Sequence, residues 1–306
     1  MIDPQALDGL YSEHRRFLWG LCYRMTGSAA DADDVVQDTF VRVIEHPPRR
    51  TNEPLRPWLV KVALNLARDL LRRRRRHEYV GPWLPSPIET DLEHDPPSHE
   101  PMTLEGRYDL LESVSFAFLV ALETLTPTAR AVLLLRDVFD YSIKETAAAL
   151  DLSEPNVKTT HHRARRAMNG YDASRRLPSA EGHASAQKAL TQFLRALQQH
   201  DVAAIEALLA EEVRTTTDGG GQFRSALRTI VGREKVMRFY LAVAENASEA
   251  AVRLVALNGA PSVVVDIPSP PPRIAPRFTL TVELNREGKI AHLYVVSATQ
   301  KLAGLK

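Results

Sequence analysis

Residues 56–76, RPWLVKVALNLARDLLRRRRR, carry two separate stripes at helical spacing and end in five consecutive arginines. One stripe is apolar and lies on one side of a 3.6-residue wheel. It comprises Trp58, Leu59, Val62, Ala63, Leu66 and Leu70. The other stripe, Lys61, Asn65, Arg68 and Arg72, recurs at i, i+4, i+7 and i+11. The pattern predicts a helix that packs by one face and leaves a basic face available to a polyanion.

Positive charge is concentrated around this helix. The whole chain has a formal net charge of only +1, yet residues 49–76 contain ten Lys or Arg and two acidic residues. Attraction to phosphates and release of their condensed counterions make such a patch a salt-sensitive site for nucleic acid. A solvated basic helix end is the alternative interpretation.

Length and composition indicate a chain of two or three ordinary domains, because 306 residues with 44% hydrophobic content supply several cores. No apolar run approaches the roughly 18 residues that a membrane-spanning helix needs. The N-terminus, MIDPQALDGL, lacks the pattern of a signal peptide. Cys22 is the single cysteine, and its apolar neighbours predict a core position. We therefore expect a cytoplasmic protein with no membrane contact.

A second helix with an acidic surface is predicted before the basic one, over residues 29–46. Ser28 stands three residues before Asp31, as in a capping box. The predicted packing side comprises Val35, Val36, Phe40, Val43 and Ile44, and the outer side Asp31, Asp33, Asp34, Gln37 and Asp38. Pro47 and Pro48 end this helix, and a short basic loop follows.

A change of composition separates this helical block from the next. Residues 79–107 contain six prolines and many acidic residues, which predicts an extended linker. We predict a first helical domain over 1–78, the linker over 79–107, a second helical domain over 108–177 and a third domain over 183–306.

The second helical domain contains a helix-turn-helix pattern. Two short helices, over about 142–150 and 154–168, are separated by three residues, and each has a serine at its start. Outward positions of the second helix are candidate contacts to DNA bases and phosphates: Asn156, Lys158, Thr159, His162, Arg163 and Arg166. His161 and His162 are sequence neighbours and therefore diverge by about 100° on a helix, so no metal site is predicted.

The third domain differs from the first two because its pattern predicts strands as well as helices. Helices over about 184–199, 202–209 and 232–245 are combined with strands near 213–218, 251–257, 262–267, 277–285 and 289–297. This order predicts an α+β domain with an antiparallel sheet.

The first two domains resemble the DNA-binding domains of a bacterial sigma factor of the extracytoplasmic-function group. The resemblance is carried by YRMTGSAADADDVVQDTFVRV with PWLVKVALNLARDLLRRRRR, and by LTPTARAVLLLRDVFDYSIKETAAALDLSEPNVKTTHHRARRAM. These segments occur in the family's order along residues 10–170. The resemblance implies RNA polymerase core and promoter DNA as partners, with no reaction, cofactor or metal of the chain's own.

The resemblance also implies roles for individual residues. In that family the acidic helix docks on the clamp helices of the largest polymerase subunit, which assigns Asp34, Gln37, Asp38 and Arg42 to polymerase contact. The basic loop and helix would read and open the promoter, which assigns Arg50, Thr51, Asn52, Lys61, Asn65, Arg68 and Arg72 to DNA. Trp58 lies on the apolar stripe, so we favour a core position over a base-stacking role.

The third domain resembles the SnoaL-like domain, of the nuclear transport factor 2 type, that some of these sigma factors carry. Trp83, Leu84 and Pro85 in the linker and Asp218, Gly219, Gly220 and Gly221 in the domain carry this resemblance. Of a further family run only Lys301 and Leu302 are kept, Gln222 replaces the usual lysine after the glycines, and His161 stands where leucine is frequent. The implied fold is two all-α domains, the second with a helix-turn-helix, followed by an α+β cone.

A regulatory hypothesis follows from these motifs. Glycines let a partner approach the backbone closely, and Trp83 is a large anchor that would dock between domains. The fused domain would then hold the DNA-binding domains in a set orientation until an unknown small ligand or another contact releases them.

Two other function classes remain open at this point. A SnoaL-type enzyme would need an acid and a base, for which Asp218, Asp266 and His292 are the candidates. A helix-turn-helix repressor with a ligand domain would explain the second domain but not the acidic and basic helices of the first.

Overall fold

The computed structural model describes residues 4–46, 54–74, 79–90, 107–245 and 250–305, with side chains from Leu7 onward. The chain forms two compact units, one of residues 1–78 and 96–176 and the other of residues 79–95 and 177–306. Linker residues 79–90 therefore belong to the second unit, although in sequence they stand between two parts of the first.

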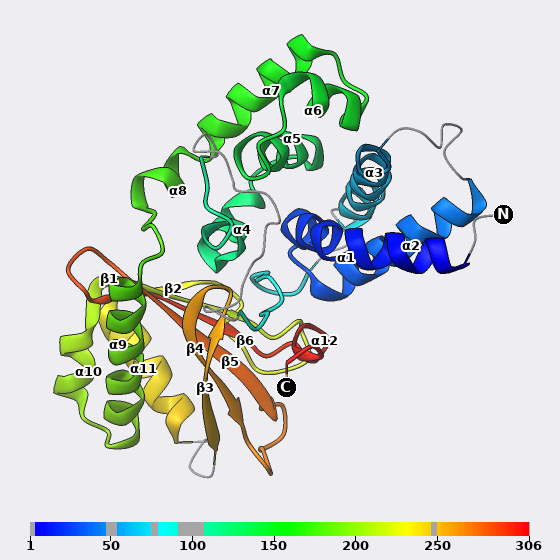
Figure 1. The fold of residues 1–306 in the computed structure, drawn as a ribbon. Coiled ribbons are helices and arrows are strands. Elements are labelled where there is room, and N and C mark those ends of the chain that lie inside the picture. The colour runs from blue at the N-terminus through cyan, green and yellow to red at the C-terminus, as the bar shows by residue number, and fades with distance from the viewer. Residues whose placement is uncertain (1–3, 47–53, 75–78, 91–106, 246–249, 306) are drawn as a thin grey trace. The chain divides into compact units, whose positions relative to one another are not determined.

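The described part of the first unit is helical (Figure 1). Its elements are α1 (Pro4–Thr26), α2 (Ala29–Glu45), α3 (Arg56–Arg74), a 3-10 helix (Glu112–Val114), α4 (Phe116–Leu122), α5 (Pro127–Asp137), α6 (Ile143–Leu150), α7 (Glu154–Ala167) and α8 (Asn169–Ser174). The helix-turn-helix predicted from the sequence is confirmed as α6 and α7.

Helix starts in the first unit follow from local capping chemistry. The Ser28 side chain accepts the N–H of Asp31 at the start of α2. Ser142 and Glu145 make a reciprocal capping box at α6, and Ser153 accepts the N–H of Asn156 at α7. Because each cap satisfies a backbone donor that the helix leaves unpaired, these serines fix where the elements begin.

The first half of the first unit, residues 4–74, has a core formed by α1, α2 and α3. Cys22 is fully buried there, and burial raises the pKa of its thiol to about 12. Two side-chain predictions are wrong. Ile44 is 54% exposed instead of packed, and Trp58 is only half-buried. The buried face of α3 is rotated from the predicted stripe and comprises Leu59, Val60, Ala63, Leu64, Ala67 and Leu71.

Two buried arginines join this first half to the second half of the first unit, residues 107–176. Arg24 of α1 donates to Ser113 Oγ at 2.7 Å and to the Leu110 carbonyl at 2.9 Å. Arg130 of α5 donates to the Met25 carbonyl at 2.7 Å and to the Leu122 carbonyl at 2.8 Å. Charge-assisted hydrogen bonds are stronger than neutral ones, so these arginines hold α1 against the helices of the second half.

The second unit combines helices with a curved six-stranded sheet (Figure 1). Its elements are α9 (Ala180–Gln198), α10 (Val202–Leu208), β1 (Leu209–Asp218), β2 (Ile230–Val231), α11 (Arg233–Ala244), β3 (Ala251–Leu257), β4 (Ala260–Asp266), β5 (Arg277–Leu284), β6 (Ile290–Val296) and α12 (Thr299–Leu302). The strand order is β2-β1-β6-β5-β4-β3.

The predicted antiparallel sheet is wrong for one pair, because β1 and β6 run parallel. The remaining neighbours are antiparallel. Parallel neighbours need a long crossover, and here β2, α11 and the meander β3–β5 provide it. The direction of that pairing depends on residues far apart in the chain, which a local pattern does not report.

An apolar cluster fills the space between the sheet and its helices. Phe193 of α9 and Tyr240 of α11 meet there with Val265, Leu280 and Leu293 of the sheet. Burial of each large apolar side chain contributes about 1.5–3 kcal/mol. The predicted fold class, two all-α regions followed by an α+β domain, is confirmed. Among the described residues, no helix is both long and apolar enough to cross a bilayer.

Candidate functional site

The acidic face of α2 is open to solvent. Asp34, Gln37, Asp38 and Arg42, the residues assigned to polymerase contact, are all exposed. Val41 and Ile44 on the same helix are 47% and 54% exposed. This surface therefore combines acids with two uncovered aliphatic side chains, which the sequence interpretation missed because it placed Ile44 on the packing side. A branched aliphatic residue amid surface acids was the available signal.

The basic face of α3 is engaged within the first unit. The Lys61 ammonium lies 2.5 Å from Oδ1 of Asp151, which ends α6, and Arg68 donates to Thr128 Oγ1 of α5 at 3.1 Å. Arg68 also contacts Asn65 Oδ1 at 3.4 Å. Burial, together with the nearby charge of Arg72, lowers the pKa of Arg68. Two of the predicted DNA contacts therefore already have protein partners.

The remaining predicted contacts of this region differ in their surroundings. Arg72 pairs with Asp69 of its own helix at 2.6 Å and is exposed. Arg50, Thr51 and Asn52 lie outside the described residues.

The six predicted DNA contacts of α7 all lie at the surface. Asn156, Lys158, Thr159, His162, Arg163 and Arg166 are exposed, whereas Val157 and Ala164 are buried. Thr159 Oγ1 donates to the Pro155 carbonyl at 3.0 Å, so part of its hydrogen-bonding capacity is used by the helix itself. Asn156 Oδ1 likewise accepts the Thr160 hydroxyl at 3.2 Å. The other four present polar or charged groups to solvent from one helix.

A buried carboxylate at the end of α5 holds α7. Asp137 Oδ2 lies 2.9 Å from His161 Nε2, and Oδ1 accepts from Arg165 at 2.6 Å. Its side chain is only 2% exposed. Burial favours the neutral acid, but the hydrogen bonds from His161 and Arg165 outweigh it, and the pKa of Asp137 is lowered. The sequence interpretation missed Asp137 because its partners lie on another helix.

Asp218, at the end of β1, binds the linker. Its Oδ1 accepts the Tyr79 hydroxyl at 2.6 Å, and its Oδ2 accepts the Leu84 N–H at 2.7 Å. Oδ2 also lies 2.7 Å from the Lys301 ammonium of α12. Oδ1 also accepts the Gly220 N–H at 3.0 Å. The carboxylate is fully buried, so four donors compensate for the water that it has lost.

Lys301 binds the same stretch of linker from the other side. Its ammonium donates to the Leu84 carbonyl at 2.5 Å and lies 4.5 Å from the centre of the Trp83 ring and 4.8 Å from that of Tyr79. Two aromatic faces and two oxygens therefore surround a cation that is 7% exposed. The sequence neighbours of these residues are also buried, namely Leu84 and Pro85 after Trp83 and Leu302 after Lys301.

The glycines after Asp218 allow close approach. Gly220 and Gly221 have φ values of 56° and 73°, which most side chains disfavour. A Cβ added to Gly219 would lie 2.8 Å from Ser225 Oγ, and one added to Gly221 would lie 3.2 Å from the Cβ of Val80 in the linker. Gln222 accepts the N–H of Thr299 at 3.0 Å, which ties this loop to α12.

The three candidate catalytic residues have separate partners. Asp218 binds the linker and Lys301, Asp266 accepts from Arg277 at 2.6 Å, and His292 lies 3.0 Å from Thr216 Oγ1. Burial, with the charge of Arg214, lowers the pKa of His292 to about 4. These contacts do not assemble an acid and a base around one reacting atom.

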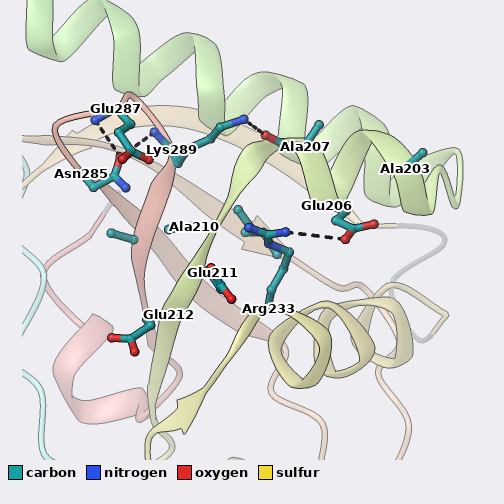
Figure 2. Close-up of a pocket in the computed structure, with 12 residues that line it drawn as sticks. Ala203, Glu206, Ala207, Ala210, Glu211, Glu212, Arg233, Asn285, Glu287 and Lys289 are labelled. Atoms are coloured by element: carbon teal, nitrogen blue, oxygen red, sulfur yellow. Dashed lines mark hydrogen bonds and ion pairs between the residues drawn. The ribbon is translucent and has the colours of Figure 1, made fainter.

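The described part of the second unit has a surface pocket of about 770 Å³ where α10, β1, α11 and the β5–β6 turn meet (Figure 2). Arg233 pairs with Glu206 at 3.6 Å across it. None of the predicted site residues lines it. Within the described ranges, no group of three or more His, Cys, Asp or Glu is placed to hold a metal ion.

Comparison with protein families matches two parts of the first unit. The model of sigma-70 region 2 matches residues 10–77, and that of sigma-70 region 4 matches residues 115–168. The first match contains α2 and α3, and the second contains the helix-turn-helix.

Comparison with individual proteins extends over both units. The chain is 30% identical over 299 residues to the ECF RNA polymerase sigma factor SigJ of Mycobacterium tuberculosis, covering 95% of this chain and 91% of SigJ. It is 35% identical to SigG of that species over 222 residues, which cover 65% of this chain and 58% of SigG. The crystal structure of Mycobacterium tuberculosis SigJ aligns with 97% of this chain and 98% of that chain at a TM-score of 0.74 and 26% identity.

Proposed function

Because the chain belongs to the extracytoplasmic-function sigma factors of RNA polymerase, we propose that it uses three surfaces of its first unit to start transcription and that its second unit controls them through the linker. Promoter recognition with core polymerase is the function of this family. The assignment of particular residues to each surface, and the control by the second unit, are the parts that we propose.

The polymerase-binding surface is the exposed face of α2. Asp34 and Asp38 provide negative charge, and Gln37 and Arg42 provide hydrogen-bond donors beside them. Val41 and Ile44 add apolar area that is uncovered in the described structure. Charges steer the encounter and fix its register, whereas buried aliphatic contacts supply affinity, so the mixed composition suits a specific protein interface.

The DNA-binding surfaces are the basic face of α3, with the loop before it, and the exposed face of α7. Lys61, Asn65, Arg68 and Arg72 would contact the downstream promoter element with Arg50, Thr51 and Asn52. On α7, Asn156 and Arg163 suit base edges, whereas Lys158 and Arg166 suit phosphates.

Binding of the promoter by α3 requires a change within the first unit. Lys61 is paired with Asp151 and Arg68 with Thr128, so each must exchange a protein partner for DNA. The pair of Lys61 and Asp151 is partly exposed and costs little to break. The buried bonds of Arg24 and Arg130 are more costly. We therefore propose that core polymerase, by binding the exposed face of α2, drives the separation of the two halves of the first unit.

Control by the second unit is carried by one observation, the capture of the linker by Asp218 and Lys301. The linker connects α3 to the second half of the first unit, and the bound segment supplies Asp218 with two of its four donors. Release of the linker would expose the Asp218 carboxylate and the Lys301 ammonium to water together. Holding the segment shortens the chain that can extend between the two DNA-binding regions, since each released residue adds roughly 3.4 Å of reach.

The test is promoter-directed transcription with purified core polymerase and a promoter library. The native chain is compared with Lys301→Met, which removes the cation, and with Lys235→Met, a matched change at an exposed site. We expect initiation that depends on the chain, a severalfold change with Lys301→Met and no change with Lys235→Met. Equal output from all three proteins would overturn control through the linker, and an absence of initiation would overturn the assigned surfaces.

A further inference from the structure

A two-residue turn joins β3 to β4 and has an unusual environment. Asn258 and Gly259 have φ values of 53° and 75°, as expected of Asn-Gly in a tight hairpin turn. Such turns are normally at the surface, because their backbone groups need water. Asn258 is nevertheless 0% exposed. Some other part of the chain must cover it and satisfy its polar groups.

The covering segment is the linker, at residues 88–90. Ile88 donates its N–H to the Asn258 side-chain Oδ1 at 3.0 Å, and its carbonyl accepts the Asn258 N–H at 3.0 Å. Two residues later, Thr90 donates its N–H to the Ala256 carbonyl at 3.0 Å. The Thr90 hydroxyl accepts the Gly259 N–H at 2.9 Å. Every one of these bonds joins the linker to the hairpin.

The geometry is that of an added β-strand. Glu89 forms an antiparallel bridge with Leu257, and the bonds of Ile88 and Thr90 flank it as the rungs of a ladder do. β3 is an edge strand, so its outward backbone groups are available for pairing. Addition of an extended peptide to such an edge is a common mode of peptide recognition.

This site shares no residue with the Asp218 site. Asp218 ends β1, whereas Asn258 follows β3, and β6, β5 and β4 lie between those strands in the sheet. The contacts also differ in kind. The Asp218 site uses a buried ion pair and aromatic rings, and the Asn258 site uses backbone pairing, an amide and a hydroxyl.

We propose that the turn at Asn258 and Gly259 is a second, independent binding site for the linker, and that the linker leaves the second unit in two separable steps. The site takes an extended peptide in which a residue pairs through its N–H and C=O and is followed two positions later by a hydroxyl. This inference rests on the proposed control through the linker. It predicts an intermediate in which one site has released the linker and the other still holds it.

The test is amide hydrogen exchange of the full chain, read at Leu84, Ile88 and Thr90. Asn258→Gly keeps the backbone of the turn and removes the acceptor of the Ile88 N–H, whereas Asn285→Gly makes the same change in the β5–β6 turn, which makes none of these bonds to the linker. We expect exchange at Ile88 and Thr90 to accelerate by about tenfold or more in the glycine variant. Leu84 should keep its protection, and Asn285→Gly should match the native chain at all three amides.

Two results would overturn the proposal. One is unchanged protection of Ile88 and Thr90 in Asn258→Gly, and the other is an equal loss at Leu84, which would mean a single cooperative clamp. Thr90→Val, which removes the hydroxyl at nearly constant volume, repeats the test without touching the turn. It should accelerate exchange at Thr90 and Ile88 with Leu84 unaffected.

The Lys301→Met variant separates this inference from the proposed function. It should expose Leu84 and leave Ile88 and Thr90 protected. If exchange follows these expectations but transcription is unchanged in both variants, the second site stands and control through the linker fails. If Lys301→Met alters transcription while Asn258→Gly leaves exchange unchanged, the control stands and the second site fails.

Discussion

The ammonium of Lys61 lies 2.5 Å from the carboxylate of Asp151, so the middle of the basic helix α3 is paired with the turn of the helix-turn-helix. Asp151 ends α6 in the left-handed conformation, with a φ of 53°. One acidic side chain therefore both ends a helix and occupies a cation that we assign to promoter DNA.

Replacement of Asp151 by asparagine should strengthen binding to promoter DNA. Asparagine also tolerates the left-handed conformation, so the cap is kept while the ion pair is lost. Because both side chains are partly exposed, we expect a gain of at most about fivefold in affinity. Fluorescence anisotropy with labelled promoter DNA measures it. Asp140→Asn is the control, because Asp140 is also exposed with a positive φ of 55° and lies outside the surfaces assigned to DNA. A weaker complex with Asp151→Asn would contradict the assignment of Lys61.

Charge reversal on α2 should weaken the complex with core polymerase. Asp38 is exposed, so Asp38→Lys should leave folding unchanged and lower the affinity by about tenfold or more through repulsion. Ile44→Ser should weaken it as well, by removing uncovered apolar area. Affinity for purified core is read by biolayer interferometry, with Glu181→Lys as an exposed control on α9. Equal affinity for all four proteins would exclude this face of α2 as the interface.

Asn156 and Arg166 of α7 should respond differently to substitution, because we assign the first to a base edge and the second to a phosphate. Asn156→Ala should lower affinity for the preferred promoter by about 1–3 kcal/mol and relax sequence preference, since an amide reads a base edge. Arg166→Ala should weaken all sequences alike and reduce the slope of log affinity against log salt by about 1. Binding titrations over a promoter library at several salt concentrations distinguish the two. Identical patterns would show that the roles are wrongly divided.

Loss of Lys301 should destabilise the second unit. In Lys301→Met the Asp218 carboxylate stays buried without its cation, which costs about 3–5 kcal/mol of unfolding free energy. The double variant Asp218→Asn with Lys301→Met should recover part of this loss, because no charge is left unpaired. Urea denaturation completes the cycle. Additive effects of the two substitutions would mean that the pair is not coupled in the folded chain.

His292 should make the stability of the second unit depend on pH. Its pKa is lowered from 6.5 to about 4, first by burial and then by Arg214. The unfolded chain therefore binds more protons between these values, so the free energy of unfolding falls as the pH drops from 6.5 towards 4. The total loss is about 3 kcal/mol. In His292→Gln, urea denaturation at several pH values should lack this loss, whereas the exposed control His46→Gln should retain it.

Much of the fold could be predicted from local chemistry. The serine caps mark the starts of α2, α6 and α7, and the alternation of apolar with polar residues in RFTLTVEL marks β5. Non-local features could not be predicted in this way. The parallel pairing of β1 with β6 joins segments separated by a helix and four strands, and the buried Asp137 meets partners on another helix. Neither leaves a periodic trace in the sequence.

The linker sites were predictable to different degrees. Trp83, Asp218 and Lys301 could be singled out only through resemblance, because nothing in their spacing brings them together. The Asn-Gly pair at 258–259 did leave a local signal, since it separates two apolar runs of strand length, and it indicates a hairpin. That the linker covers this turn is a tertiary fact. The exposure of Ile44 was missed because a helical stripe does not reveal where its edge meets solvent.

The residues that bind each other at the Asp218 site are made at very different times. Leu84 and Lys301 are 217 residues apart, which a ribosome covers in roughly 10–40 s at 5–20 residues per second. The DNA-binding helices are complete well before Lys301 leaves the ribosome, and during that interval the linker has no ammonium to bind. Each newly made molecule thus passes through a period without this restraint, and the length of that period is set by the rate of translation.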